Sequence, residues 1–320
     1  MSSSTKQEGN PLLKDAPPPW HSVALLVLFT AIFISRFPSL QSIDEAATIQ
    51  TFTHIMFPEW MSLKTLGILR VLIAVIIWVT SFYTIFISDG FLVVTNYAAE
   101  SKLKRIRFRL TGWKSLAPLT HWHWIVLGLA FSLSGAIALD IEFGLEHHVS
   151  PYMLRAALIC FEIGAPLSFL VSAVVTHAIW PQAVKLQSDL TDLKHPRTLL
   201  MHNANVIFSL LEVCLLGGIP VRLQDIALAP LLGCVYVVFA WSMRTSWVDV
   251  STEGPQFLYH FMDTTVEKTS SLALCANLLV LLLAYLGFAQ VHSLLNLLGG
   301  GLVVHVTIVI LLASLVCRFR

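Results

Sequence analysis

Long runs of apolar residues recur along the whole chain, separated by short polar stretches. A helix needs about 20 apolar residues to cross a bilayer. Eight runs approach that length, namely 20–37, 66–87, 119–139, 153–180, 198–217, 226–243, 270–289 and 296–317. They are too long for the strands of a membrane barrel, which alternate over about ten residues. The pattern therefore predicts an all-α, polytopic transmembrane helical bundle of about eight spans.

Composition agrees with this class of protein. The chain is 56% hydrophobic and 12% charged, whereas a soluble domain carries about 25% charged residues. Residues 1–19 are polar and rich in proline, which predicts a disordered tail. The expected layout continues with a first span and loop over 20–65, a six-helix core over 66–290 and an extra C-terminal span over 291–320. Within the first loop, the 38–65 segment is expected either to fold as a lid or to lie on the membrane surface.

The distribution of lysine and arginine predicts the orientation, because cytoplasmic loops carry an excess of both. Placing the basic stretch "ESKLKRIRFRLTGWKS" in the cytoplasm puts fifteen loop and tail cations on that side and three on the other. Both termini are then cytoplasmic, in either the endoplasmic reticulum or the plasma membrane. The basic stretch also suits contact with anionic lipids. A net charge of +1 gives no reason to expect nucleic acid as a partner.

The apolar run 198–217 carries polar residues that are costly in hydrocarbon. On a helical wheel at roughly 100° per residue, Thr198, His202, Asn205, Ser209 and Glu212 share one narrow stripe. This stripe is expected to face protein or water rather than lipid. Asn203 lies off the stripe.

A second polar set lies in the run 153–180. Arg155 and Glu162 are seven residues apart and therefore share a helix face, too far apart to pair with each other. Each is expected to meet a group on another helix. Because Arg155 and Glu212 fall at similar depth in this topology, they are predicted to pair with each other. Such structural pairing and a functional role both remain open for these residues, although Glu212 is interpreted as structural.

A candidate catalytic pair joins two of the predicted spans. Pro118 suits the first turn of a helix, which places Thr120 near the start of one span, and His202 follows Pro196 by about two turns in another. Both spans run inward from the same side. A hydroxyl and an imidazole facing one cavity form a nucleophile and a general base, with Asn205 proposed to hold the imidazole in one tautomer. The alternatives are a helix-capping Thr120 and a structural, hydrogen-bonding His202.

Metal and cofactor sites are not expected. The histidines of "HWH" (121–123) and "HH" (147–148) fall on opposite sides of the predicted membrane, without a carboxylate-rich companion. The chain contains no GxSxG, Walker or GxGxxG motif. Its five cysteines all lie within predicted spans and form no CxxC pair, which excludes the usual pattern of a disulfide framework or zinc ribbon.

The segment "HNANVIFSLLEVCLLGGIPVRLQDIALAPLLGCVYVVFAW" (202–241) resembles the family of androgen-induced, androgen-dependent TFPI-regulating and insect rolling stone proteins. "FLYHFMD" (257–263) and "LTHWHWIVLGL" (119–129) are similar to two further segments of that family. The resemblance covers roughly residues 66–290, leaving the first and last spans as additions. The family's characterised members are multi-pass hydrolases of fatty acid esters of hydroxy fatty acids, with a threonine nucleophile and a histidine base.

Carried onto this chain, the resemblance implies that Thr120 is the nucleophile and His202 the base. His123 or Asn203 is the expected oxyanion donor, no cofactor is required, and the partners are membrane lipids and a lipid-ester substrate. The rolling stone proteins act in cell fusion, so the alternative is a non-catalytic bundle, either transporter-like, receptor-like or an adhesion factor. The sequence leaves the oligomeric state open.

Overall fold

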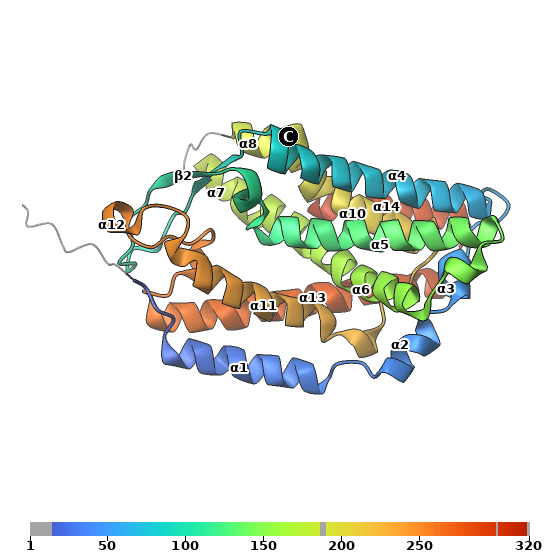
Figure 1. Ribbon diagram of the computed structural model, residues 1–320, viewed down its shortest axis with the longest axis horizontal. Coiled ribbons are helices and arrows are strands. Elements are labelled where there is room, and N and C mark those ends of the chain that lie inside the picture. The colour runs from blue at the N-terminus through green and yellow to red at the C-terminus, as the bar shows by residue number, and fades with distance from the viewer. Residues whose placement is uncertain (1–14, 186–189, 299, 319–320) are drawn as a thin grey trace, which may run out of the picture.

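The computed structural model describes residues 15–185, 190–298 and 300–318, and its long helices lie side by side as an elongated bundle (Figure 1). Five helical segments are long and apolar enough to cross a membrane among these residues: Leu63–Ile87, Leu119–Glu142, Pro151–Lys185, Leu223–Thr245 and Glu267–Leu295. A sixth span is present if α1 (Trp20–Ser35) and α2 (Leu40–Ala46), bent by 61°, count as one. The protein is thus an integral membrane helical bundle.

The structure does not confirm the eight spans predicted from the apolar runs. The run 198–217 forms a helix only as far as Cys214, because the chain then turns at Gly218, which has a positive φ of 69° that favours glycine. The run 296–317 yields α14 (Leu302–Val316), with 15 residues, and α1 has 16. Each is short of the roughly 20 residues that a span needs. The length of an apolar run therefore overestimates the length of the helix that forms within it.

The core of the bundle is built by α4 (Leu63–Phe82), α5 (Leu119–Glu142) and α6 (Pro151–Val174), which pack against one another in sequence order. The helices α10 (Asn205–Cys214), α11 (Leu228–Ser242), α13 (Glu267–Leu298) and α14 pack on α6. The outermost helix is α1, against α11 and α13 (Figure 1). Glycines permit close approach of α4 and α5, since a Cβ at Gly135 would overlap Val71.

Three helices continue into a wider π-helical turn. These turns are η1 (Tyr83–Ile87) after α4, η4 (Val175–Ile179) between α6 and α7 (Trp180–Lys185), and η5 (Leu200–Ala204) between α9 (Pro196–Leu199) and α10. All three lie toward the end of the bundle where α5 begins. Such turns are rare and frequently lie at functional sites.

A small β-hairpin closes this end and was missed by the all-α prediction. Strand β1 (Phe91–Val94) pairs antiparallel with β2 (Arg107–Leu110). In β2, Phe108 and Leu110 are buried while the two arginines point outward, the alternation of a half-buried strand. The strand is only four residues long and lies within the basic stretch, so its pattern was hidden by charge. Apart from this hairpin, the prediction of a helical fold is confirmed.

Short helices complete the connections at both ends of the bundle. They are α3 (Ile49–Thr53), η2 (Gly112–Leu116), η3 (Glu146–His148), α8 (Thr191–Lys194), η6 (Leu223–Asp225), η7 (Met243–Thr245), α12 (Val250–Glu253) and η8 (His260–Met262). At the end opposite the hairpin, α2 contacts α6 and α3 contacts α5. Phe52 of α3 is fully buried. The 38–65 segment thus packs onto the end of the bundle.

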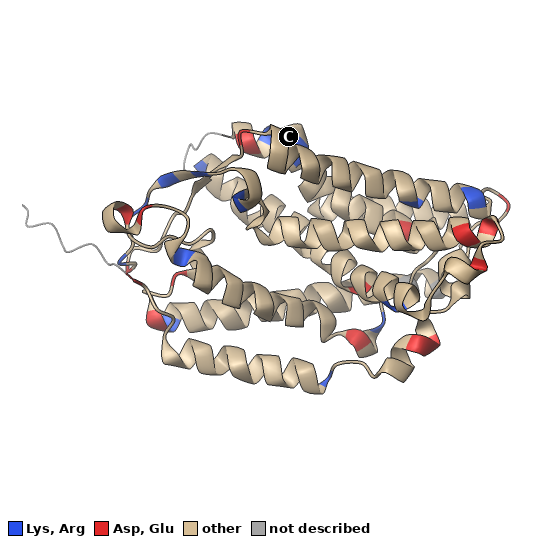
Figure 2. Cartoon of the chain, in the orientation of Figure 1, with Lys and Arg blue, Asp and Glu red and all other residues tan. Residues whose placement is uncertain are grey.

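Charge is unevenly distributed between the two ends (Figure 2). Acidic residues lie at both ends, and at one of them, around α2 and the end of α5, they include Asp44, Glu45, Asp140, Glu142 and Glu146. Lysines and arginines lie on and around the hairpin at the other end. This asymmetry is the structural counterpart of the loop bias seen in the sequence.

Candidate active site

The structure brings Thr120 and His202 together from two different helices. Thr120 is the second residue of α5, directly after the N-cap residue Pro118 and Leu119. His202 lies in the middle of the π-helical turn η5. The Thr120 Oγ1 and His202 Nε2 atoms are 3.4 Å apart, at the long end of hydrogen-bonding distance. A base must lie within such reach of the hydroxyl whose proton it takes, and these contacts are often long without substrate.

The other ring nitrogen of His202 fixes its tautomer. Nδ1 lies 2.8 Å from the backbone carbonyl oxygen of Thr198. Since a carbonyl only accepts hydrogen bonds, Nδ1 carries the proton and donates it. In the neutral imidazole, Nε2 is then unprotonated and faces the Thr120 hydroxyl, which is the arrangement that a general base needs.

Asn205 does not hold His202, contrary to the prediction. Its amide nitrogen donates to His123 Nε2 at 3.0 Å, and its amide oxygen accepts from the Ser172 hydroxyl at 3.0 Å. The π-helical turn explains the difference, because it advances through a smaller angle per residue than the roughly 100° of the wheel. His202 and Asn205 are therefore spread further apart around the helix axis than predicted. The Thr198 carbonyl takes the orienting role instead.

The deeper part of the polar stripe forms a hydrogen-bonded seam between helices. Asn205 and Ser209 of α10 are fully buried. The Ser168 hydroxyl of α6 donates to Ser209 Oγ at 3.1 Å. The prediction that the stripe faces protein is thus confirmed for this part. His123 of α5 belongs to the same seam through Asn205, so the structure gives its Nε2 a structural partner and does not direct that atom to Thr120.

Asn203 is bound to the C-terminal segment and does not serve Thr120. Its amide nitrogen donates to the Arg318 carbonyl at 2.7 Å, and its amide oxygen accepts from the Arg318 N–H at 2.8 Å. Asn203 lies off the stripe, as predicted, and both its amide oxygen and one of its two amide N–H groups are bound to Arg318. The structure thus gives Asn203 a structural partner and does not place it in the lining of the cavity that borders Thr120.

The predicted pair Arg155–Glu212 is also wrong, because each residue has another partner. Glu212 forms a two-point ion pair with Arg70 of α4, at 2.9 Å (Nε to Oε2) and 2.6 Å (Nη2 to Oε1). Both side chains are fully buried. Arg155 instead pairs with Asp44 of α2, at 2.5 and 2.9 Å, near the surface. Arg70 lies within the apolar run 66–87, where a charge is itself a signal of a buried partner.

Glu162 meets a group outside its own helix, although that group lies in the loop before η6 and not on another helix as predicted. Its Oε1 accepts from the backbone N–H of Arg222 at 3.0 Å and from Arg222 Nε at 3.2 Å. Arg222 also forms an ion pair with the buried Asp225 of η6. This cluster lies at the end of the bundle opposite Thr120, so it belongs to the structure of that end and not to the Thr120–His202 pair.

A cavity of about 240 Å³ borders Thr120. Its walls come from α5, α6, η4, α11, α13 and the loop around η8, and most of them are aliphatic. The polar side chains in the lining are Thr120, Tyr236, Trp241, Tyr259, Ser270 and Asn277. Thr120 thus borders the cavity, whereas His202 is not among the lining residues.

Two tyrosines accompany Thr120 in the cavity wall, and sequence reasoning missed both. Their rings are 6.3 Å apart, and the Tyr236 hydroxyl donates to the Ala117 carbonyl at 3.1 Å. Burial raises the pKa of Tyr259, which lies in the loop before η8. Its hydroxyl is therefore protonated at neutral pH and can donate a hydrogen bond. The segment "FLYHFMD" was noted for its likeness to a family, but nothing in its spacing indicated proximity to Thr120.

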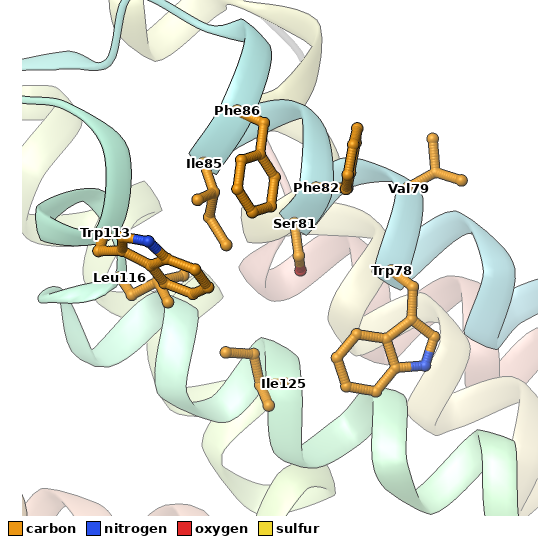
Figure 3. Close-up of a pocket in the computed structure, with 9 residues that line it drawn as sticks. All are labelled: Trp78, Val79, Ser81, Phe82, Ile85, Phe86, Trp113, Leu116 and Ile125. Atoms are coloured by element: carbon orange, nitrogen blue, oxygen red, sulfur yellow. The ribbon is translucent and has the colours of Figure 1, made fainter.

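A second, larger depression of about 520 Å³ lies on the outer surface between α4, η1, η2 and α5 (Figure 3). It is lined by aromatic and aliphatic side chains, including the exposed Phe82, Phe86 and Trp113. Its one hydroxyl, from Ser81, donates to the Ile77 carbonyl of its own helix. The groove suits contact with lipid chains but offers no group for chemistry.

The described part of the chain contains no group of three or more His, Cys, Asp or Glu residues arranged to hold a metal ion. Thr120 itself lies beside an imidazole and two phenols, at the edge of an apolar cavity. Comparison with known proteins adds no further guide: no protein-family model, no curated protein and no solved structure matches this chain.

Proposed function

We propose that this membrane protein hydrolyses lipid esters, with Thr120 as nucleophile and His202 as general base. The observation that carries the proposal is the contact of 3.4 Å between Thr120 Oγ1 and His202 Nε2, on the wall of an apolar cavity. The hydrogen bond from His202 Nδ1 to Thr198 supports it by leaving Nε2 free to accept a proton. The resemblance to the androgen-induced family supports the same roles.

The reaction follows acyl-transfer chemistry. Thr120 Oγ1 attacks the ester carbonyl carbon while its proton passes to His202 Nε2, giving a tetrahedral oxyanion. The oxyanion collapses, the bond to the alcohol oxygen breaks, and the alcohol leaves with the proton from His202. Water, deprotonated by His202, then attacks the acyl carbon, the bond from that carbon to Thr120 Oγ1 breaks, the acid leaves, and Oγ1 takes the proton back from His202. The Tyr259 hydroxyl is the donor in the cavity wall that we assign to the oxyanion, in place of His123 and Asn203.

The proposed orientation places the hairpin, Thr120 and both termini on the cytoplasmic side, in the endoplasmic reticulum or the plasma membrane. It rests on the fifteen-to-three bias of loop cations. The substrate then enters from the lipid phase. The apolar lining supports this route, since an acyl chain leaves the bilayer for a similar medium.

The test is turnover by purified protein on a panel of lipid esters. We expect Thr120→Ala and His202→Ala each to lower turnover by at least about 100-fold, the low end of what a positioned base contributes, without loss of folded protein. Asn205→Ala serves as the control, because it weakens the seam beside the pair but removes no reacting group. A lack of turnover by the unmodified protein, together with no labelling of Thr120 by a serine- and threonine-directed probe, would favour the non-catalytic alternative.

A further inference from the structure

The cavity beside Thr120 contains two buried polar groups that lack a partner. Ser270, in the first turns of α13, and Trp241, in the last turn of α11, are only 4% and 6% exposed. Neither the Ser270 hydroxyl nor Trp241 Nε1 has a hydrogen-bond partner among the described residues. Both side chains line the cavity. Buried polar groups are nearly always paired, so two unpaired ones in one cavity point to a ligand that pairs them.

Most polar groups of the lining lie toward one end of the cavity, and the deeper part is aliphatic except for Asn277, whose amide donates to the Ala273 carbonyl of its own helix. Helices α5 and α13 begin at the hairpin end of the bundle, and α11 ends there (Figure 1). Because Thr120 and Ser270 lie near the starts of α5 and α13, and Trp241 near the end of α11, all three lie toward that end. Further along the same helices, Gly233 and Leu281 line the aliphatic end. The cavity thus matches an amphiphile whose head group lies toward the hairpin.

The chemistry of the lining limits the head group. Trp241 Nε1–H only donates, so it requires an oxygen acceptor, whereas the Ser270 hydroxyl donates or accepts. None of the residues lining the cavity is Lys, Arg, His, Asp or Glu. A phosphate or carboxylate bound there would lose its hydration without gaining a counter-charge, which is strongly unfavourable. An uncharged head group with hydroxyl or ester oxygens avoids this cost.

The size of the cavity limits the number of chains. Its volume of about 240 Å³ is below the roughly 300–1,000 Å³ of pockets that enclose drug-sized ligands. It accommodates one head group with part of a single chain. The lining includes Ala276 and Val280 of α13, whose side chains are exposed on the outer surface of the bundle. The rest of the chain can leave by this side into the surrounding lipid.

We infer that the cavity binds an uncharged, single-chain amphiphile of the monoacylglycerol type, with its head-group oxygens at Trp241 and Ser270 and its ester at Thr120. As a statement about substrate, this inference rests on the proposed hydrolase. As a statement about binding, it stands on the two unpaired groups and the uncharged lining.

The experiment measures equilibrium binding of radiolabelled 1-monooleoylglycerol to the full chain carrying Thr120→Ala, reconstituted in lipid nanodiscs. Unlabelled competitors share the same oleoyl chain but differ in head group: monooleoylglycerol, oleate at a pH where it is ionised, and lysophosphatidate. We expect monooleoylglycerol to compete at least about tenfold better than either anion. Equal or better competition by the anions overturns the inference.

Two variants locate the head group. Trp241→Phe keeps the ring but removes the N–H, and Ser270→Ala removes the hydroxyl. Each is expected to weaken binding by about 2- to 10-fold, the effect of one hydrogen bond. Trp78→Phe is the matched control, because Trp78 lines the outer groove and bonds Ser132, and it should leave binding unchanged. Unaltered binding in both cavity variants contradicts the inference. If binding follows the prediction but the protein with Thr120 intact turns over no ester, the hydrolase proposal fails and the ligand class stands.

Discussion

At the scale of single residues, the buried pair Arg70–Glu212 is expected to control stability. Replacing one partner, as in Arg70→Met, leaves a carboxylate in the core without a counter-charge and should cost about 3–5 kcal/mol. The double variant Arg70→Met, Glu212→Leu removes both charges and should recover much of that loss. Thermal unfolding in detergent measures the difference.

The control for this prediction is Arg155→Met, which breaks the pair with Asp44. Those two side chains are 25% and 45% exposed, so water takes over from the lost partner and little change is expected. An equal loss from Arg155→Met and Arg70→Met would contradict the importance assigned to burial. Gly217→Ala offers a second check, because its Cβ would overlap Arg70 Nη2; we expect it to destabilise the protein.

The sequence was enough to predict that Thr120 and His202 lie together, but not to predict which polar side chains surround them. Thr120 and His202 could be chosen because each follows a proline that sets a helix start and because both helices enter from the same side. The partners of Asn203, Asn205 and Glu212 could not be predicted. Which of several polar groups meet depends on the rotation of each helix, and the sequence of one helix does not set the rotation of its neighbour.

At the scale of elements, the π-helical turns η4 and η5 are linked by the last residue of α14 and the segment that follows it. Thr176 of η4 donates to the Val316 carbonyl at 2.5 Å, and Asn203 of η5 bonds both backbone groups of Arg318. Asn203 also adjoins His202 in the chain. The end of α14 therefore braces the turn that carries the proposed base.

Asn203→Leu tests this brace. The variant keeps the volume of the side chain but removes its two hydrogen bonds to the Arg318 backbone, at a cost of about 0.5–1.5 kcal/mol for each bond. We expect lower thermal stability and, if the proposed reaction is correct, a lower kcat with little change in KM, because the substrate cavity is not touched. Gln224→Leu, which removes an exposed hydrogen bond to Ser42, is the control. A rise in KM without a change in kcat would indicate that the segment shapes the cavity instead.

Helices whose formation depends on the length of an apolar run were predicted well, whereas features that depend on local backbone geometry were not predicted. The helices α4, α5, α6, α11 and α13 follow from long apolar runs, and the structure has all of them. The π-helical turns do not follow, because widening a turn by one residue leaves no mark in composition. It was this wider turn that separated His202 from Asn205 and transferred the orienting contact to the Thr198 carbonyl.

At the scale of the whole molecule, the charge asymmetry predicts that the hairpin end faces the cytoplasm. Cysteines introduced one at a time, as Lys104→Cys and His147→Cys, report which side of the membrane each end of the bundle faces. Both positions are exposed, Lys104 in the 95–106 loop and His147 in η3. In intact cells, a membrane-impermeant maleimide should label His147→Cys only if the protein reaches the plasma membrane, and it should not label Lys104→Cys in either case. Permeabilising the plasma membrane alone should expose Lys104→Cys in both locations. If His147→Cys then stays protected until the inner membranes are opened, the protein resides in the endoplasmic reticulum.

The native cysteines give the background labelling, which is measured on the unmodified chain. Labelling of Lys104→Cys in intact cells would reverse the orientation, place Thr120 and His202 on the outer side and contradict the cation bias from which the topology was predicted.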